Sequence, residues 1–244
     1  MRAVVAYTWA RDVAGAVVRQ DGSVEWRSAK MAPGEDDHAA LAAALSVTAA
    51  AGDELVGLTI GNGDASWALA RGVEQAVQVT DATVQDDDAA TAAVLAAGVR
   101  SIGAVDVVLV GDSEEHPGVP VALAAHLGWP AVVGVAAATA RDGRVEVVRT
   151  VDDLEETLSL ALPVVVGVAA RSAEARAPGM KELLAARKRP VTRTSLAELG
   201  VEVPEPLVDR GTHLPATAPT RVFDGEPGEA ARQLVAALRN EGVL

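Results

Sequence analysis

Three loops carry glycine and polar residues of the kind that bind small anionic ligands, and each follows a short apolar run. One loop follows Val5-Ala6, one is Gly61-Asn62-Gly63 after Ile60, and one runs from Gly111 to Gly118. In open α/β sheets such loops lie at the carboxyl ends of strands. They lead into helices whose first N–H groups are free and carry partial positive charge. The pattern predicts a ligand site at the strand ends.

The third loop is acidic, because Asp112, Glu114 and Glu115 follow Gly111. Carboxylates at that range repel a phosphate unless something neutralises them, and phosphate binding needs hydrogen-bond donors. None of the three loops has a Walker Gly-Lys-Ser/Thr sequence or a complete GxGxxG. The residues thus do not support a loop that hydrolyses nucleotides.

Residues for other chemistries are missing or badly spaced. The chain has no cysteine, which excludes disulfides, thiolate metal sites and cysteine-ligated iron–sulfur clusters. The histidines have no metal-ligand spacing; they are His38, His116, His126 and His213. Asp86-Asp87-Asp88 is more simply the start of a helix than a cation site, and no Gly-x-Ser-x-Gly elbow is present. An α/β enzyme acting on a small molecule is therefore a disfavoured alternative, and redox chemistry needs a borrowed cofactor.

The chain is strongly acidic, with 34 Asp and Glu against 21 Lys and Arg and a formal net charge of −13. This charge repels nucleic-acid backbones and anionic membrane surfaces, so we expect no nucleic-acid partner. No apolar stretch reaches the roughly 18 residues that span a bilayer, and we expect no membrane insertion. Residues 2–7 have the pattern of a strand directly behind the first Met. That leaves no room for a signal region and predicts a cytoplasmic protein.

Short runs rich in Val, Ile and Leu alternate with Ala-rich stretches along most of the chain. The expected strands are 3–7, 54–60, 77–80, 105–110, 131–135 and 163–168, and the expected helices are about 35–51, 64–76, 87–103 and 117–127. This alternation is typical of parallel βαβ units with helices on both faces of the sheet. Half of the residues are hydrophobic but only 2% are aromatic, so Ala, Val and Leu must form the core. The sequence predicts an α/β, three-layer, Rossmann-like nucleotide-binding fold with a mostly parallel sheet.

Two hairpins and a C-terminal arm are added to this plan. The hairpins turn at Asp21-Gly22 and Asp142-Gly143, pairs that supply the positive φ of tight turns. After about Gly200, prolines interrupt a stretch with little apolar periodicity, which predicts a domain over 1–200 and an extended arm over 201–244. The arm ends in a helix over 229–239 with an apolar stripe. The stripe could pack on the chain's own body or on a partner subunit.

Two segments resemble one known family. The first contains Val147, Arg149, Asp152, Asp153, Glu156, Thr157, Leu158 and Pro163, and the second runs from Ala177-Pro178-Gly179-Met180 through Arg187-Lys188-Arg189-Pro190. Both are similar to the small (beta) subunit of electron transfer flavoproteins, the first to its signature stretch and the second to its recognition loop. The resemblance extends from the first strand to the C-terminal helix.

The resemblance implies an electron carrier rather than an enzyme. Such a chain pairs with a large (alpha) subunit that holds most of an FAD, docks flavin-dependent dehydrogenases and passes electrons to an acceptor such as a quinone oxidoreductase. The family also carries a structural AMP in the strand-end loops. The cofactor-binding residues it implies are Ala6, Trp9, Ile60, Gly61, Gly111, Asp112, Gly118 and Glu156, and the docking residues are Met180, Lys181 and Leu183.

The chain also departs from the family pattern. Thr8-Trp9 replaces two basic residues, Ala32-Pro33-Gly34-Glu35 replaces an Asn-Pro element, and Asp152-Asp153-Leu154 replaces an Asp-Gly-Gly turn. Trp9 is then either a flavin contact or a packed aromatic, and Arg149 with Glu156 is either a contact near the flavin or an exposed surface pair. The alternative function is a diverged adenine-nucleotide-binding module of the same fold without electron-transfer activity.

Overall fold

The computed structural model describes residues 1–50, 52–61, 64–82, 87–169, 177–203, 210, 214–216 and 220–244. Its contacts divide the chain into two compact units. The larger unit consists of Met1–Val17 and Glu25–Arg210, and the smaller one of Val18–Val24 and Gly211–Leu244. The proposed sites below all lie in the larger unit.

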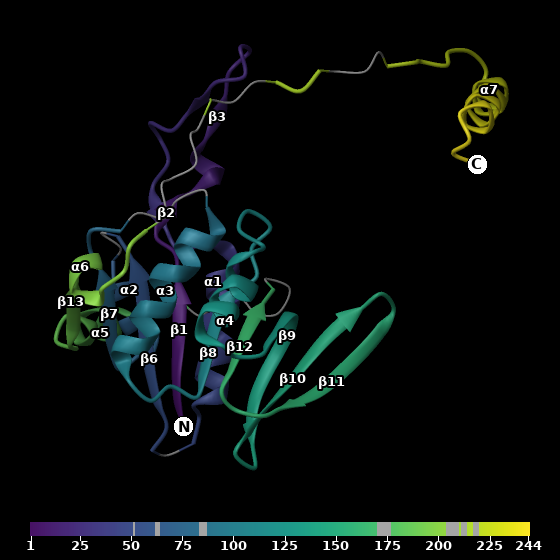
Figure 1. Ribbon diagram of the computed structural model, residues 1–244. Coiled ribbons are helices and arrows are strands. Elements are labelled where there is room, and N and C mark those ends of the chain that lie inside the picture. The colour runs from purple at the N-terminus through teal and green to yellow at the C-terminus, as the bar shows by residue number, and fades with distance from the viewer. Residues whose placement is uncertain are drawn as a thin grey trace. The chain divides into compact units, whose positions relative to one another are not determined.

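One nine-stranded sheet forms the centre of the larger unit, in the order β11-β10-β9-β12-β8-β1-β6-β7-β13 (Figure 1). Every neighbouring pair from β9 to β13 is parallel, whereas β10 pairs antiparallel with β9 and β11. The strands are β1 (Arg2–Tyr7), β6 (Glu54–Ile60), β7 (Gln75–Val79), β8 (Val107–Gly111), β9 (Ala131–Arg141), β10 (Arg144–Val151), β11 (Leu154–Leu160), β12 (Val164–Val168) and β13 (Val191–Thr194).

Helices cover both faces of the parallel part (Figure 1). One face packs against α1 (Glu35–Val47), α2 (Ser66–Leu69) and α5 (Met180–Ala186). The other packs against α3 (Asp88–Ile102), α4 (Val119–Leu127) and α6 (Leu196–Leu199). Both core layers consist mainly of Ala, Val and Leu. The predicted three-layer, Rossmann-like α/β fold is therefore confirmed.

The helix expected over 64–76 is wrong. Helix α2 ends at Leu69, and β7 already begins at Gln75. Gly72 lies between them with a φ of +121°, a backbone conformation that side-chain-bearing residues rarely adopt and that a helix cannot contain. The prediction was wrong because the Ala-rich, helix-favouring composition continues past the end of α2 almost to the start of β7. Strand β13 was not predicted.

The hairpins and minor elements follow the turn chemistry. Asp142 and Gly143 have φ values of +51° and +71° between β9 and β10, as expected for a tight hairpin turn. The Asp21-Gly22 turn joins β3 (Val17–Val18) to β4 (Val24–Glu25). A second small sheet pairs β2 (Ala10–Arg11) with β5 (Met31–Ala32), and a 3₁₀ turn, η1, spans Val13–Gly15.

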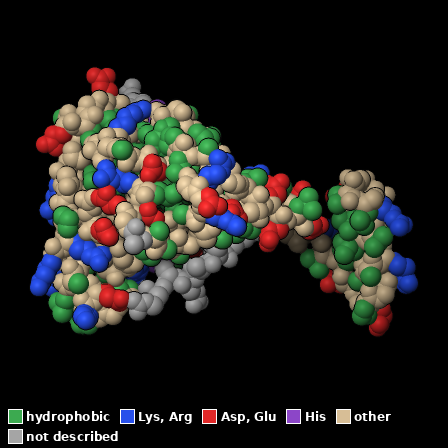
Figure 2. Space-filling model, turned by 90° about the horizontal axis from the view of Figure 1, so that it is seen from below, with side chains coloured by type: hydrophobic (Ala, Val, Ile, Leu, Met, Phe, Trp, Pro, Cys, Tyr) green, Lys and Arg blue, Asp and Glu red, His purple; other side chains and the backbone are tan. Residues whose placement is uncertain are grey.

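The smaller unit ends in helix α7 (Pro227–Asn240), close to the predicted 229–239. Glu229 lies in its first turn and Arg239 in its last, which suits the helix dipole. Leu234 and Val235 are exposed, and hydrophobic side chains gather along one side of this helix (Figure 2). Its apolar face lacks a covering surface within the smaller unit as described. Within the described residues, no helix combines the length and apolarity needed to cross a bilayer.

Candidate functional site

The main cleft lies where the chain changes direction across the sheet. β1 and β8 are neighbours, but the chain leaves β1 through α1 for β6 on one side and leaves β8 through α4 for β9 on the other. Open α/β sheets bind ligands at such switch points. The cleft here has a volume of about 540 Å³ and is lined by Thr8, residues 10–14, residues 32–37, Gly111 and residues 113–116. We call it the switch-point cleft.

Asp37 holds the floor of the switch-point cleft together. Its carboxylate oxygen Oδ2 accepts hydrogen bonds from the Thr8 amide at 2.8 Å, the Thr8 hydroxyl at 2.7 Å and the Gly34 amide at 2.8 Å. Gly34 is the N-cap of α1 and has no side chain to cap the helix, so Asp37, three residues on, reaches back to its amide. One carboxylate therefore joins the end of β1 to the start of α1.

Asp37 is buried, with 4% of its surface exposed. Burial raises the pKa of its carboxyl from 3.8 to about 6, against the opposing effect of the hydrogen bonds from Thr8 and Gly34. The neighbouring charge of Asp36 adds to the rise. This carboxylate consequently titrates close to neutral pH.

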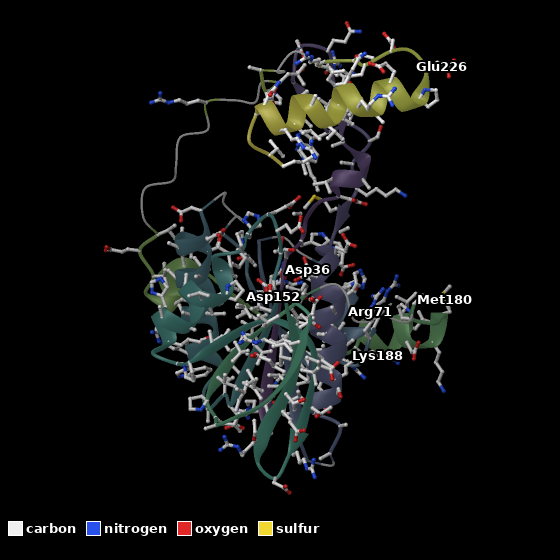
Figure 3. The ribbon with its side chains drawn as sticks, turned by 90° about the vertical axis from the view of Figure 1, so that its right-hand side faces the viewer. Asp36, Arg71, Asp152, Met180, Lys188 and Glu226 are labelled. Atoms are coloured by element: carbon white, nitrogen blue, oxygen red, sulfur yellow. The ribbon has the colours of Figure 1, made fainter. Side chains whose placement is uncertain are left out.

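Gly111 allows β8 to approach the first turn of α1. A Cβ at this position would lie 2.9 Å from the Cβ of Asp36 and 3.1 Å from its carbonyl carbon, which is closer than real Cβ atoms come to other heavy atoms. Asp36 lies at the start of α1 (Figure 3). The close approach brings the β8–α4 loop and the α1 N-terminus to opposite sides of the same cleft.

The β8–α4 loop is fixed by two carboxylates at its ends. Asp88 accepts from the Gly118 amide at 2.8 Å and lies 3.1 Å from Nδ1 of His116. Asp112 accepts from the Gly134 amide in β9 at 2.7 Å. Asp112 is therefore used to tie the loop to the sheet rather than turned into the cleft.

The cleft residues do not fit a phosphate. Its lining carries the carboxylates of Asp12, Glu35, Asp36, Asp37, Glu114 and Glu115, and the guanidinium of Arg11 is its only Lys or Arg side chain among the described residues. The free amides at the start of α1 are already partly used by Asp37. Phosphate recognition needs donors and positive charge, so this cleft is not built for the AMP that the resemblance implies.

The structure places the predicted cofactor residues in different surroundings. Gly111 lines the cleft, whereas Ala6 and Ile60 are buried in the core beneath α3 and α4. Gly61 continues the pairing with β7, its amide donating to the Val79 carbonyl at 2.7 Å. Asn62 and Gly63 lie outside the described residues. Gly118 is held by Asp88. As cofactor contacts these residues remain predictions.

Trp9 is partly buried and packs against the α1 side of the core. Beyond it, Val13 and Met31 are exposed by 56% and 50%. Arg149 and Glu156 are register partners on β10 and β11, joined by a 2.8 Å ion pair from Nε to Oε2. Both side chains are about one third exposed. The predicted pairing on one excursion of the chain is therefore present, and its contact with a flavin stays a prediction.

The predicted docking residues all lie on helix α5. Met180 is the first residue of the helix and is 73% exposed, and Leu183 is 39% exposed. Lys181 is also exposed, and Figure 3 shows Met180 at the end of α5 that points away from the sheet. The helix begins with Glu182 accepting from the Gly179 amide at 2.6 Å. Met180 is thus not a buried loop methionine.

Two features escaped the sequence analysis. Asp37 is the third residue of α1, and the N-cap residue Gly34 has no side chain to cap the helix. An acid at this third position commonly accepts from the N-cap amide, and this pattern could have identified Asp37. An aromatic cluster was also missed, in which the ring of Trp67 lies 5.0 Å from Tyr7 and 5.2 Å from His38. Tyr7 and Trp67 lie 60 residues apart in the sequence, and no local pattern links them.

Comparison with known proteins places the chain in one family. Residues 26–199 match the family described as "Electron transfer flavoprotein domain". The chain is 34% identical over 142 residues to the "Electron transfer flavoprotein subunit beta" of Mycobacterium leprae (strain TN), covering 57% of this chain and 53% of that protein. It is 30% identical over 187 residues to the proteins of the same name from Mycobacterium bovis (strain ATCC BAA-935 / AF2122/97) and Mycobacterium tuberculosis (strain ATCC 25618 / H37Rv), covering 72% of this chain and 70% of each.

The aligned region thus spans about half of the Mycobacterium leprae relative and 70% of the other two. The family match includes the parallel strands other than β1, the β10–β11 hairpin and helix α5. The chain therefore belongs to the electron transfer flavoprotein family, among its beta subunits.

Proposed function

We propose that this chain is the small subunit of a heterodimeric electron transfer flavoprotein. Its partner is a large (alpha) subunit, and the two chains hold one FAD between them. Membership of the beta-subunit family over residues 26–199 carries this proposal. The alternative, a nucleotide-binding module without electron transfer, is supported less well because the switch-point cleft is acidic.

Exposed apolar side chains support a partner chain. Val151 and Leu154 flank the β10–β11 turn and are exposed by 41% and 70%, and Val13 is exposed by 56%. Leu234 and Val235 add an apolar face on α7. Apolar surface of this kind is typical of the core of a stable interface. In this proposal these surfaces contact the large subunit, and the C-terminal arm contacts it as well.

The residues that this proposal places beside the flavin suit an FAD that is held mainly by another chain. FAD supplies the electron acceptance and donation when bound. This chain contributes an apolar edge from Trp9 and Val13, and a guanidinium from Arg149 that Glu156 holds in place at 2.8 Å. An arginine fixed by a carboxylate can orient toward a polar ring atom without losing side-chain entropy on binding. The protein is then an electron carrier, and it works in the cytoplasm.

Co-expression with a candidate large subunit tests the pairing. We expect a stable 1:1 complex that retains one flavin, released by denaturation and counted by its visible absorbance. A complex with no flavin would contradict the FAD part of the proposal. Failure to form any complex, together with nucleotide binding by the isolated chain, would support the alternative module.

Met180 provides a prediction for the docking surface on α5. Because its side chain is 73% exposed, Met180→Glu should leave the fold intact but place a charge where an apolar contact is expected. We expect the KM for flavin-dependent dehydrogenases in reducing the heterodimer to rise about tenfold or more, as for a lost interface anchor. Reduction by dithionite, which needs no docking, should be unchanged.

Val121→Glu is the matched control for this docking experiment. Val121 lies on α4 and is 54% exposed, on the face of the sheet opposite α5. A KM that rises equally in both variants would point to a general charge effect. An unchanged KM in Met180→Glu would mean that α5 does not dock the dehydrogenases.

A further inference from the structure

A second hollow lies apart from the switch-point cleft, between α1, α2 and α5. Its volume is about 310 Å³, within the range of small-molecule pockets. Leu41 and Leu45 from α1 and Leu69 from α2 line it, and Pro178 and Ala185 close the side of α5. The lining is thus largely aliphatic. We call it the α5 hollow.

Arg71 is the polar group that sets this hollow apart. Its Nη1 donates to the Trp67 carbonyl at 3.0 Å, and its guanidinium lies 5.2 Å from the centre of the Trp67 ring. Its Nε is buried and has no hydrogen-bond partner. Figure 3 shows Arg71 between α1 and α5.

Within the part of the chain that the structure describes, Arg71 has no carboxylate as a counter-ion. Among the described residues no carboxylate lies within ion-pair distance of Arg71. Arg189 also lines the hollow and donates to the carbonyls of Leu69, at 2.9 Å, and Val73. Glu182, the one carboxylate among the described lining residues, accepts from the Gly179 amide at the start of α5. Burial, and secondly the charge of Arg71, lower the pKa of nearby His38.

We propose that the α5 hollow binds a small monocarboxylate with an apolar body. The carboxylate accepts from the Arg71 guanidinium, whose two-nitrogen edge matches carboxylate geometry. The aliphatic part lies against Leu41, Leu45 and Leu69. A volume of about 310 Å³, near the lower end of small-molecule pockets, sets the size class of the ligand. The inference does not depend on the proposed electron-transfer function.

The same site connects the ligand to the docking helix. Ala185 and Glu182 belong to α5 and line the hollow, while Met180 at the start of the same helix points away from it. A molecule in the hollow therefore packs against the inner side of the helix. The bound molecule should therefore stabilise the position of α5.

Hexanoate titration of the full chain, by calorimetry and by tryptophan fluorescence, tests the site. Hexanoate has eight non-hydrogen atoms and should bind with one site per chain, whereas hexan-1-ol and hexylamine should bind at least about tenfold more weakly. Arg71→Gln should weaken hexanoate about tenfold or more, because the charge-assisted bonds are lost. Ala185→Phe, which fills the hollow from an exposed position on α5, should abolish binding while Arg71 stays in place.

Arg187→Gln is the control, because Arg187 is an exposed guanidinium at the end of α5 that does not line the hollow. It should bind hexanoate as the wild type does. The proposal is overturned if the wild type does not bind hexanoate, if hexan-1-ol binds as tightly, or if Ala185→Phe has no effect. It is also overturned if Arg71→Gln, with an unchanged circular dichroism spectrum, binds normally.

Discussion

Asp37→Ala is expected to destabilise the protein by about 3 kcal/mol at neutral pH, because the amides of Thr8 and Gly34 and the Thr8 hydroxyl lose a buried acceptor. Removal of a buried charge offsets part of this loss. The free energy of unfolding, measured by urea denaturation, checks the prediction. A loss below about 0.5 kcal/mol, the size of an ordinary surface substitution, would mean that Asp37 does not hold β1 and α1 together.

Asp37→Asn separates the charge from the hydrogen bonds. The amide oxygen can still accept from Thr8 and Gly34, but it does not titrate. In the wild type the folded pKa of about 6 lies above the unfolded value of 3.8, so the folded state binds the proton more tightly. This group therefore gives its full stability below pH 3.8, and that stability is lost as the pH rises from about 4 to about 6.

The two variants differ in how stability changes with pH. Between pH 4 and pH 7, the free energy of unfolding of the wild type relative to Asp37→Asn should fall by about 2 kcal/mol, since most of the pKa difference, at about 1.4 kcal/mol per unit, lies within this range. The comparison cancels the contributions of all other carboxylates. A difference that stays constant over this range, or that grows with pH, would show that the pKa of Asp37 is not raised.

Gly111→Val is expected to be the second large effect. A Cβ at Gly111 would lie 2.9 Å from the Cβ of Asp36 and 3.1 Å from its carbonyl carbon. Because helix backbone cannot move aside as a side chain can, β8 and α1 must separate. Overpacking of this kind costs about 1–3 kcal/mol, and the larger valine should be near the upper end. Thermal unfolding measures the loss.

Gly98→Ala is the matched control for this steric argument. A Cβ at Gly98 would lie 2.8 Å from Cδ1 of Leu58, a similarly short distance but to the end of a flexible side chain. Alanine also favours the α3 helix by about 1 kcal/mol over glycine. Gly98→Ala should therefore lower the free energy of unfolding clearly less than Gly111→Ala, which is the same substitution at the backbone contact. Equal losses would mean that backbone contact at Gly111 is not what matters.

The strands of the central sheet were predictable because each is a short apolar run ended by a turn residue. The predicted 54–60 coincides with β6, and the Asp142-Gly143 turn lies where its residues require. The helix over 64–76 was not predictable from composition, since Gly72 ends it through a backbone angle that no hydrophobic pattern reports. The sequence shows where a strand or helix begins and ends only when a turn residue marks that boundary.

The switch-point cleft was only partly predictable. Its place follows from the parallel order of β1 and β8, and Gly111 was identified. Asp37 was not, because its importance depends on Thr8, which lies 29 residues earlier, and on complete burial. The α5 hollow depends likewise on Arg71 meeting a helix more than 100 residues later. Contacts of this range are set by the fold as a whole.

The C-terminal end of helix α5 leads directly to the edge of the central sheet. At that end Arg189 bonds the carbonyls of Leu69 and Val73, and the next strand, β13, pairs with β7. At the other end Met180 stands largely in solvent. A partner that contacts Met180 therefore meets the chain on the helix that precedes β13, the outermost strand on that side of the sheet. Strands β1 and β8, which shape the switch-point cleft, lie farther inside the sheet, with β6 and β7 between β1 and β13.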